Sequence, residues 1–309
     1  MAKRPKPSSS APRAAQAADA TVSVAGTVLR VLGTILLIVL VTGLLFLCIF
    51  AYYVKNCLST DLDVQLSDFT VSLSSSILYE DSDGNWQNLT NLSSTENRVW
   101  IDYADIPKDM EHAAVAIEDK RFYKHKGVDW YRTTGAFINM FLSMKNDFGG
   151  STITQQLAKN LFPRDTARHR GKIARTSKLV VSKLKEWITA LKLEYNYTKE
   201  EIAAMYLNTV AYGSNAYGIK SAAHTFFNKE PHELNVQEAA VLVGVVNAPT
   251  RYSPVRNPES ALARRNLVLT RMQQAGALTR AQADSLSALP IVLNYKPVSH
   301  NEGAATYFR

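Results

Sequence analysis

Three short segments of this 309-residue chain combine carboxylates with polar or cationic residues at helical spacing. In the first, the apolar run 113–117 ends at Glu118, and Phe122 and His125 follow at i+4 and i+7, on one face if the helix continues. A carboxylate against apolar walls is desolvated, which makes it a better general base. The spacing alone, however, favours an ordinary helix end with solvated charges.

The second segment opens with the glycine pair at 149–150 and continues as a helix that Ser151 or Thr152 can cap. Thr152, Gln156 and Lys159 then fall at i, i+4 and i+7. The free amides of such a helix start attract anions, and Lys159 adds a full charge, so a diphosphate would fit. A capped surface helix explains the same residues equally well.

The third segment, residues 183–194, places Lys183 and Glu186 at i and i+3 on one helical face. Taken alone, this is best explained as a surface ion pair worth about 0.3–0.5 kcal/mol.

The elements that must position these residues are mostly helical. From about residue 107, apolar residues recur at three- and four-residue spacing, which predicts helices. The predicted helices are 108–123, 152–161, 172–194, 198–208, 215–227, 235–247 and 259–275. Thr198 followed by Glu201 predicts a capping box.

An uncharged apolar run over residues 31–54 predicts a transmembrane helix. At 1.5 Å per residue it would be about 36 Å long, enough for a hydrocarbon core of about 30 Å with some tilt. It is longer than the apolar part of a signal peptide, and no Ala-x-Ala cleavage site follows it. Lys and Arg precede the run, which predicts a cytoplasmic N-terminus with the rest of the chain outside.

These patterns divide the chain into five parts. They are a disordered cytoplasmic tail (1–30), the transmembrane helix (31–54), a β-containing stem (55–100), a helical domain (101–280) and a linker (281–309). In the stem, Asp83-Gly84 lies between two β-prone segments and predicts a type I′ hairpin.

Composition limits the partners. The formal charge of +8 suits an anionic substrate or a membrane surface. The sequence has no zinc-ligand cluster, RNA-binding aromatic motif or phosphate loop, so we expect no nucleic-acid partner. Cys48 and Cys57 would lie about 13 Å apart along a helix, too far for a disulfide.

In their order and separations, the three segments resemble the motifs of glycosyltransferase family 51, the peptidoglycan glycosyltransferase domain of class A penicillin-binding proteins. The resemblance covers roughly residues 75–280. The five matching stretches are 118–129, 149–160, 183–194, 206–213 and 239–249.

The resemblance implies a mainly α, lysozyme-like helical domain with a membrane-proximal second lobe. It implies that the chain polymerises lipid II into β-1,4-linked strands, with inversion at C1 of N-acetylmuramic acid and release of undecaprenyl diphosphate. Glu118 matches the catalytic base. Glu186 matches a second glutamate that positions the diphosphate, directly or through Mg²⁺ or Mn²⁺; no cofactor is expected to be essential, and the metal ligands are undetermined. The positions matching cleft or phosphate-binding residues are Asp119, Phe122, His125, Thr152, Gln156, Lys159, Lys183 and Asn208.

Three features depart from that pattern or extend it. Ser182 stands where the family usually has Arg, which leaves two alternatives: one phosphate-binding cation is missing, or Arg175 or Lys185 supplies it. Residues 136–144 are strongly apolar but too few to span a bilayer, which fits either a lobe that meets the lipid tail or a core helix. No Lys-Thr-Gly or Lys-Ser-Gly motif is present, and the last residues resemble a linker into a transpeptidase, so we expect this chain to be the N-terminal part of a longer protein.

The expected location is the bacterial inner membrane, with a single span and an extracytoplasmic catalytic domain. The expected partners are lipid II, the growing lipid-linked strand, the membrane, and cell-wall synthesis or division proteins. Two alternatives stay open: a lysozyme-like enzyme that cleaves glycan strands, and a non-catalytic cell-wall scaffold.

Overall fold

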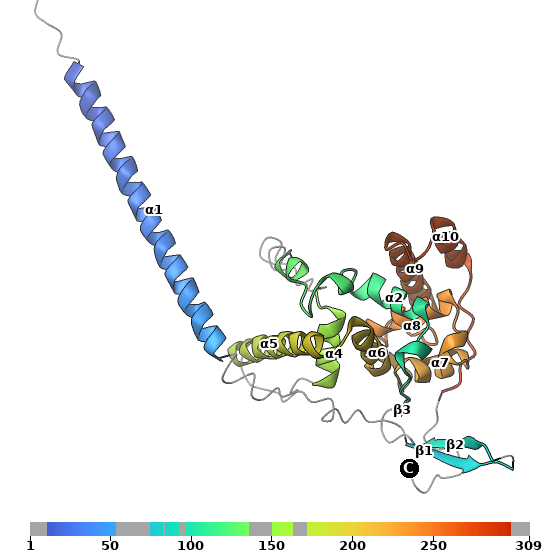
Figure 1. Cartoon of the computed structure of the whole chain (residues 1–309). Helices are drawn as coiled ribbons and strands as arrows, with labels where there is room; N and C mark the ends of the chain where they lie inside the picture. Colours follow the sequence, from blue (N-terminus) through green and yellow to red (C-terminus); the bar gives the residue numbers. More distant parts are fainter. Residues whose placement is uncertain are drawn as a thin grey trace, which may run out of the picture. The chain divides into compact units, whose positions relative to one another are not determined.

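The computed structural model describes residues 11–53, 75–82, 84–92, 97–135, 150–162 and 172–297. The chain forms two compact units, Met1–Asp63 and Val64–Arg309. Each is considered by itself below (Figure 1).

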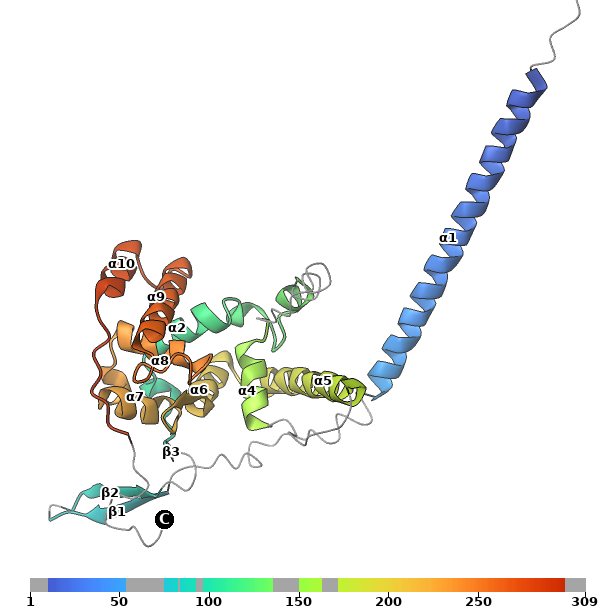
Figure 2. The same ribbon diagram turned by 180° about the vertical axis from the view of Figure 1, so that it is seen from behind.

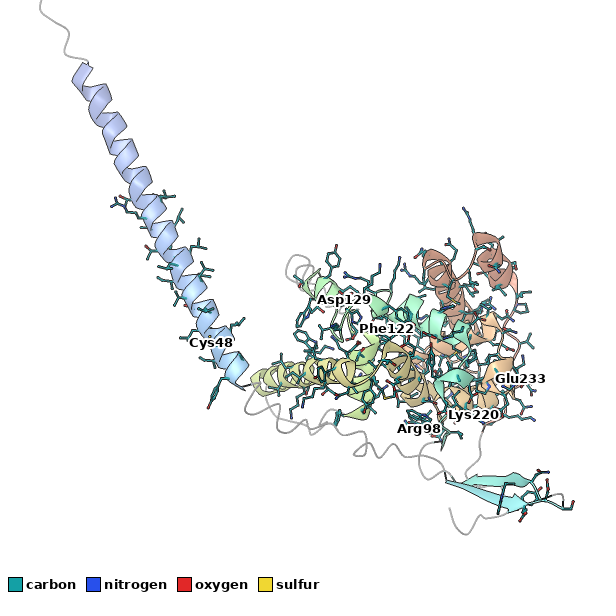
Figure 3. All side chains as sticks on the ribbon, in the orientation of Figure 1. Cys48, Arg98, Phe122, Asp129, Lys220 and Glu233 are labelled. Atoms are coloured by element: carbon teal, nitrogen blue, oxygen red, sulfur yellow. The ribbon has the colours of Figure 1, made fainter. Side chains whose placement is uncertain are left out.

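The first unit contains one long helix, α1, from Ala11 to Tyr53. Its stretch Gly26–Ile49 is long and apolar enough to cross a membrane, with a mean hydropathy of 2.9 and none of its most apolar window buried. The helix starts within the tail that we expected to be disordered, because the alanine-rich sequence there has high helix propensity. The Cys48 side chain projects from α1 as a free, exposed thiol (Figure 3), and Cys57 lies outside the described residues.

The predicted hairpin is confirmed. Strand β1 (Ser75–Glu80) pairs antiparallel with β2 (Trp86–Leu92), and Glu80 and Trp86 are the last partners before the loop. The loop therefore covers residues 81–85, which is longer than a two-residue type I′ turn. Asp81 closes it by accepting hydrogen bonds from the backbone amides of Gly84 and Asn85.

The rest of the second unit is mainly helical, as predicted. Its α-helices are α2 (Lys108–Glu118), α4 (Ile153–Leu161), α5 (Lys172–Asn196), α6 (Lys199–Thr209), α7 (Ile219–Phe227), α8 (Val236–Val246), α9 (Pro258–Gln274) and α10 (Arg280–Ala288). Among the described residues, three 3₁₀ turns accompany them: η3 (Tyr103–Asp105), η4 (Phe122–Lys124) and η5 (Pro231–Glu233). A small sheet has the strand order β3 (Asn97–Arg98), β5 (Ala216–Tyr217), β4 (Ala211–Gly213), with β5 parallel to β3 and antiparallel to β4.

Helix α8 forms the centre of this unit. It is apolar on all sides, and residues 239–245 are buried on all sides, as expected of a core helix. It packs against α2, α7, α9 and β4 (Figure 2). Because Gly244 has no side chain, α9 can approach closely: a Cβ on this residue would lie 3.2 Å from Cγ of Arg264.

Side-chain caps fix where several helices begin. Thr152, Thr198, Asn235 and Thr279 each form a capping box at the start of α4, α6, α8 and α10. Such a cap contributes about 1 kcal/mol. The box at Thr198 was predicted. The one at Thr279 was not, and α10 extends the helical fold beyond residue 280, into the expected linker.

Candidate active site

The end of α2 decides how the first motif is arranged. Asp119 leaves helical geometry, with φ −150° and ψ 72°, so α2 stops at Glu118 and the chain continues into η4. The helix does not continue past Glu118, so the condition under which Glu118, Phe122 and His125 would share a helical face is not met. Phe122 and His125 are buried, with Phe122 fully inside the helical unit (Figure 3), and only Glu118 reaches a cavity.

The Glu118 carboxylate has two different sides. Oε2 accepts a 2.8 Å hydrogen bond from Nε2 of Gln156. Oε1 is buried, has no hydrogen-bond partner among the described residues, and lies 4.0 Å from Nη2 of Arg264. Because the side chain is only 10% exposed, protein groups dominate its surroundings. One oxygen is therefore held by a hydrogen bond, while the other has no hydrogen-bond partner among the described residues.

Tyr206 orients the Gln156 amide. Its hydroxyl donates to Oε1 of Gln156 over 3.3 Å, which turns Nε2 toward Glu118. Burial raises the pKa of Tyr206 well above its ordinary value, and the negative charge of Glu118 adds to this effect. The phenol therefore stays protonated and keeps its role as donor at any working pH.

Asp119 connects α2 to α4 and does not line the cavity. Its Oδ2 lies 2.9 Å from Nε2 of His125 and accepts a 3.1 Å hydrogen bond from the backbone amide of Ile153. Its Oδ1 lies 3.5 Å from Nη1 of Arg132. This fully buried carboxylate thus holds the first turn of α4 beside the end of α2.

Thr152 also positions α4. It is the N-cap residue, accepts from the amide of Gln155, and donates through Oγ1 to the carbonyl of Gly127. Gly127 has φ +79°, and a Cβ there would lie 2.6 Å from the carbonyl oxygen of Ala190 on α5, so only glycine fits. Thr152 is fully buried, and its neighbour Ser151 lines the cavity instead.

The α5 wall of the cavity is cationic at its surface. Nζ of Lys183 donates to Oγ of Ser151 over 2.9 Å and to Oε2 of Glu186 over 2.8 Å. The Lys183 side chain is 33% exposed while that of Glu186 is 5% exposed, so the ammonium lies nearer to the cavity opening. Lys159 on α4 is exposed beside them.

The cavity has a volume of about 640 Å³. It is lined by residues of α2, α4, α5 and α9, by the end of α8 and the segment after it, by the segment that follows α6, and by Arg132 and Ser151. Helices α4 and α5 pack side by side at one wall (Figures 1 and 2). The predicted site residues that line it are Glu118, Gln156, Lys159, Lys183 and Glu186.

Asn208 lies away from the cavity, like Asp119, Phe122, His125 and Thr152. Its amide is fully buried, accepts from the backbone amide of Ile101, and donates to the carbonyls of Ile101 and Ala204. These bonds use both hydrogens of its buried amide group, and they tie α6 to the chain before η3.

Several lining residues were not predicted. The charged or polar ones are Arg132, Ser151, Gln155, Asn160, Asn247, Arg264 and Arg271. Arg264 and Arg271 are seven residues apart on α9, a spacing that puts them on one helical face and could have revealed them. These two arginines also place positive charge in the cavity, where the chain has Ser182 in place of the arginine usual in the family. Of the two residues expected to replace that charge, Lys185 is exposed and does not line the cavity, and the Arg175 side chain is not described. Residues 136–144 lie outside the described residues.

The described residues of the site offer few ligands for a metal ion. Among the described residues no group of three or more His, Cys, Asp and Glu side chains could hold an ion. Glu186 is paired with Lys183, so a cation there would compete with an ammonium and would depend on substrate oxygens.

Comparison with known proteins gives matches over the part of the chain that builds the cavity. A family model described as Transglycosylase matches residues 85–273. Penicillin-binding protein 1F of Bacillus subtilis (strain 168) is 38% identical over 213 residues, which cover 69% of this chain and 28% of that protein. Penicillin-binding protein 1A of Aquifex aeolicus (strain VF5) is 38% identical over 198 residues, covering 64% of this chain and 26% of that protein. The crystal structure of penicillin-binding protein 1A from Haemophilus influenzae aligns with a TM-score of 0.37 at 20% identity, over 73% of this chain and 22% of that one. The chain thus spans less than a third of the length of these relatives.

Proposed function

The chain belongs to the transglycosylase family, and from this premise we propose that it is a peptidoglycan glycosyltransferase that polymerises lipid II. The observation that carries the proposal is the Glu118 carboxylate, which has one hydrogen-bonded oxygen and one oxygen without a hydrogen-bond partner among the described residues. It lies in a cavity whose other walls carry lysines and arginines and the Lys183–Glu186 pair. Such a cavity suits a neutral nucleophile and an anionic leaving group.

The gap between Glu118 and Arg264 fits the acceptor. A hydroxyl oxygen can lie about 2.8 Å from both Oε1 of Glu118 and Nη2 of Arg264, because these atoms are 4.0 Å apart. In this position the 4-hydroxyl of N-acetylglucosamine donates its proton to Glu118. Its oxygen then attacks C1 of the donor N-acetylmuramic acid, the bond from C1 to the diphosphate oxygen breaks, and the configuration at C1 inverts.

The leaving diphosphate takes the bonding electron pair and needs positive charge around it. Lys183 and Lys159, which both line the cavity, supply two cations. Glu186 acts through Lys183, because their 2.8 Å contact directs the ammonium toward Ser151. We therefore assign Glu186 a positioning role in diphosphate binding.

The membrane helix α1 places the enzyme where its substrate lies. In the part of the chain that the structure describes, α1 is the one helix long and apolar enough to cross a membrane, and the basic residues before it favour a cytoplasmic N-terminus. The catalytic unit then lies outside the bacterial inner membrane, at the surface that presents the sugars of a lipid-linked donor.

Strand cleavage is the alternative enzyme activity, and the cavity suits it less. Glycosidases place two carboxylic acids across the scissile bond. The carboxylates that line the cavity among the described residues are Glu118 and Glu186, and Glu186 is paired with Lys183. The group that faces Oε1 of Glu118 is the cation Arg264.

The test is to incubate the full chain with lipid II in detergent, and separately with preformed glycan strands, and to separate the products by length. We expect polymer from lipid II and no shortening of the strands. Shortened strands would support the lytic alternative, and no product from either substrate would support a non-catalytic scaffold.

A further inference from the structure

The Arg264 side chain extends from α9 toward the Glu118 carboxylate and packs against two residues, Gly244 and Tyr252. Its aliphatic stem passes Gly244 of α8, where a Cβ would lie 3.2 Å from Cγ of the arginine. Its guanidinium carbon lies 5.2 Å from the centre of the Tyr252 ring. The side chain is 14% exposed, so both supports act in a largely desolvated place.

Few other contacts restrain this guanidinium. Among the described residues Arg264 donates no hydrogen bond, and its Nε is buried without a partner. The next residue differs: Arg265 donates to the side chain of Asn266 and to the carbonyls of Ser287 and Leu289. Packing thus positions Arg264, whereas hydrogen bonds position Arg265.

Backbone hydrogen bonds hold the chain at Tyr252, a half-buried residue that does not line the cavity. It lies between α8 and α9, and its amide donates to the carbonyl of Ala248 over 2.9 Å. The loop is closed further on by a 2.8 Å bond from the amide of Asn257 to the carbonyl of Ser253. Arg251 also lies near the ring, with its guanidinium carbon 5.4 Å from the ring centre.

We propose that Tyr252 is a positioning residue, whose ring keeps Arg264 at the separation from Glu118 that the reaction requires. This rests on the proposed function, since it concerns the acceptor hydroxyl between the two groups. Without the ring, the guanidinium is free to close onto Oε1 of Glu118 as a direct ion pair. That contact would occupy the oxygen that has to take the proton.

The ring of Tyr252, and not its hydroxyl, should determine where Arg264 lies. A phenylalanine keeps the face on which the guanidinium lies, whereas a leucine removes it. If the free energy of a cation–π contact is lost fully from the transition state, the rate falls about 2-fold for an exposed contact and about 30-fold for a desolvated one. We therefore expect Tyr252→Leu to lower kcat about 10-fold with little change in KM, and Tyr252→Phe to stay near wild type.

A double-mutant cycle on the full chain tests this, with rates of lipid II polymerisation for wild type, Tyr252→Leu, Arg264→Ala and the double variant. If the ring acts through Arg264, Tyr252→Leu costs nothing further once Arg264 is alanine. The matched control is Arg251→Ala, which removes the other guanidinium on the ring and should leave the rate unchanged.

The proposal would be overturned if the rate of the double variant were reduced by the product of the two single reductions. It would also be overturned if Tyr252→Phe were as slow as Tyr252→Leu. Should the leucine variant not fold, phenylalanines of increasing fluorine content at position 252 replace it, because fluorination weakens the ring's attraction for a cation at nearly constant shape. The rate should then fall with each fluorine, and a constant rate would contradict the proposal. A wild-type chain that makes no polymer would instead reject the proposed function.

Discussion

Gln156 offers a sensitive test of how Glu118 is prepared for catalysis. Its amide connects two buried groups, accepting from the hydroxyl of Tyr206 over 3.3 Å and donating to Oε2 of Glu118 over 2.8 Å. Gln156→Leu keeps a side chain of similar size and removes both contacts. The Glu118 carboxylate would then be free to rotate, and its second oxygen would lose its donor.

The size of the effect follows from these two bonds. A hydrogen bond to a charged group contributes about 1.5–3 kcal/mol, which corresponds to roughly 10- to 150-fold in rate if the loss is felt fully in the transition state. Water can replace little of it, because the Glu118 side chain is only 10% exposed. The orphaned Tyr206 hydroxyl would in addition cost about 1–3 kcal/mol of folding stability.

The assay is the initial rate of lipid II polymerisation, with the free energy of unfolding measured alongside. Adding Tyr206→Phe to Gln156→Leu removes the orphaned hydroxyl, so it should restore stability without restoring activity. If Gln156→Leu keeps activity within about 3-fold of wild type, or if the double variant regains activity, Gln156 does not orient the base and the reasoning is wrong.

Three further predictions concern binding, pH and the anchor. Lys159→Ala should weaken binding of a phosphoglycolipid donor mimic at unchanged thermal stability, with exposed Lys120→Ala as the control; unchanged affinity would remove Lys159 from the diphosphate site. Burial raises the pKa of Glu111, but hydrogen bonds from Tyr123, Tyr103 and Lys108 outweigh it and hold the pKa below its ordinary 4.5. The Glu111 carboxylate therefore stabilises the fold above pH 4.5, and this stability is lost as the pH falls through its lowered pKa. Glu111→Gln should flatten the curve of unfolding free energy against pH below 4.5, and an unchanged curve would contradict this role of Glu111. Deleting residues 1–54 should leave a folded enzyme that is active in detergent and slow in liposomes, because the anchor raises the effective concentration of lipid-linked substrate; equal rates in liposomes would mean that α1 gives no such advantage.

Local patterns predicted most of the helices, because apolar spacing and capping residues act within a few positions along the chain. The same patterns placed Gln156, Lys159, Lys183 and Glu186 on faces that do line the cavity. They missed α10, whose nine residues are buried mainly through Ala283 and therefore carry a weak apolar signal.

The errors arise where distant parts of the chain meet. Asn208 matched a motif, but its hydrogen-bond partners include Ile101, about a hundred positions earlier, so its burial was not visible locally. Helix α2 ends at Glu118 because Asp119 instead binds His125 and the start of α4. The role of Arg264 depends on the close approach of α8 and α9 at Gly244, which only packing reveals.

The most direct test of the central claim compares wild type with Glu118→Gln in lipid II polymerisation at saturating substrate. The substitution keeps the size of the side chain and an oxygen that can accept from Gln156, so the fold should survive. The control variant is Asp284→Asn on α10, which also removes one negative charge but from an exposed side chain. We predict that wild type and the control polymerise lipid II equally and that Glu118→Gln is slower by about 10²- to 10⁴-fold, the usual value of a general base. A folded Glu118→Gln variant with activity within about 3-fold of wild type would contradict the account.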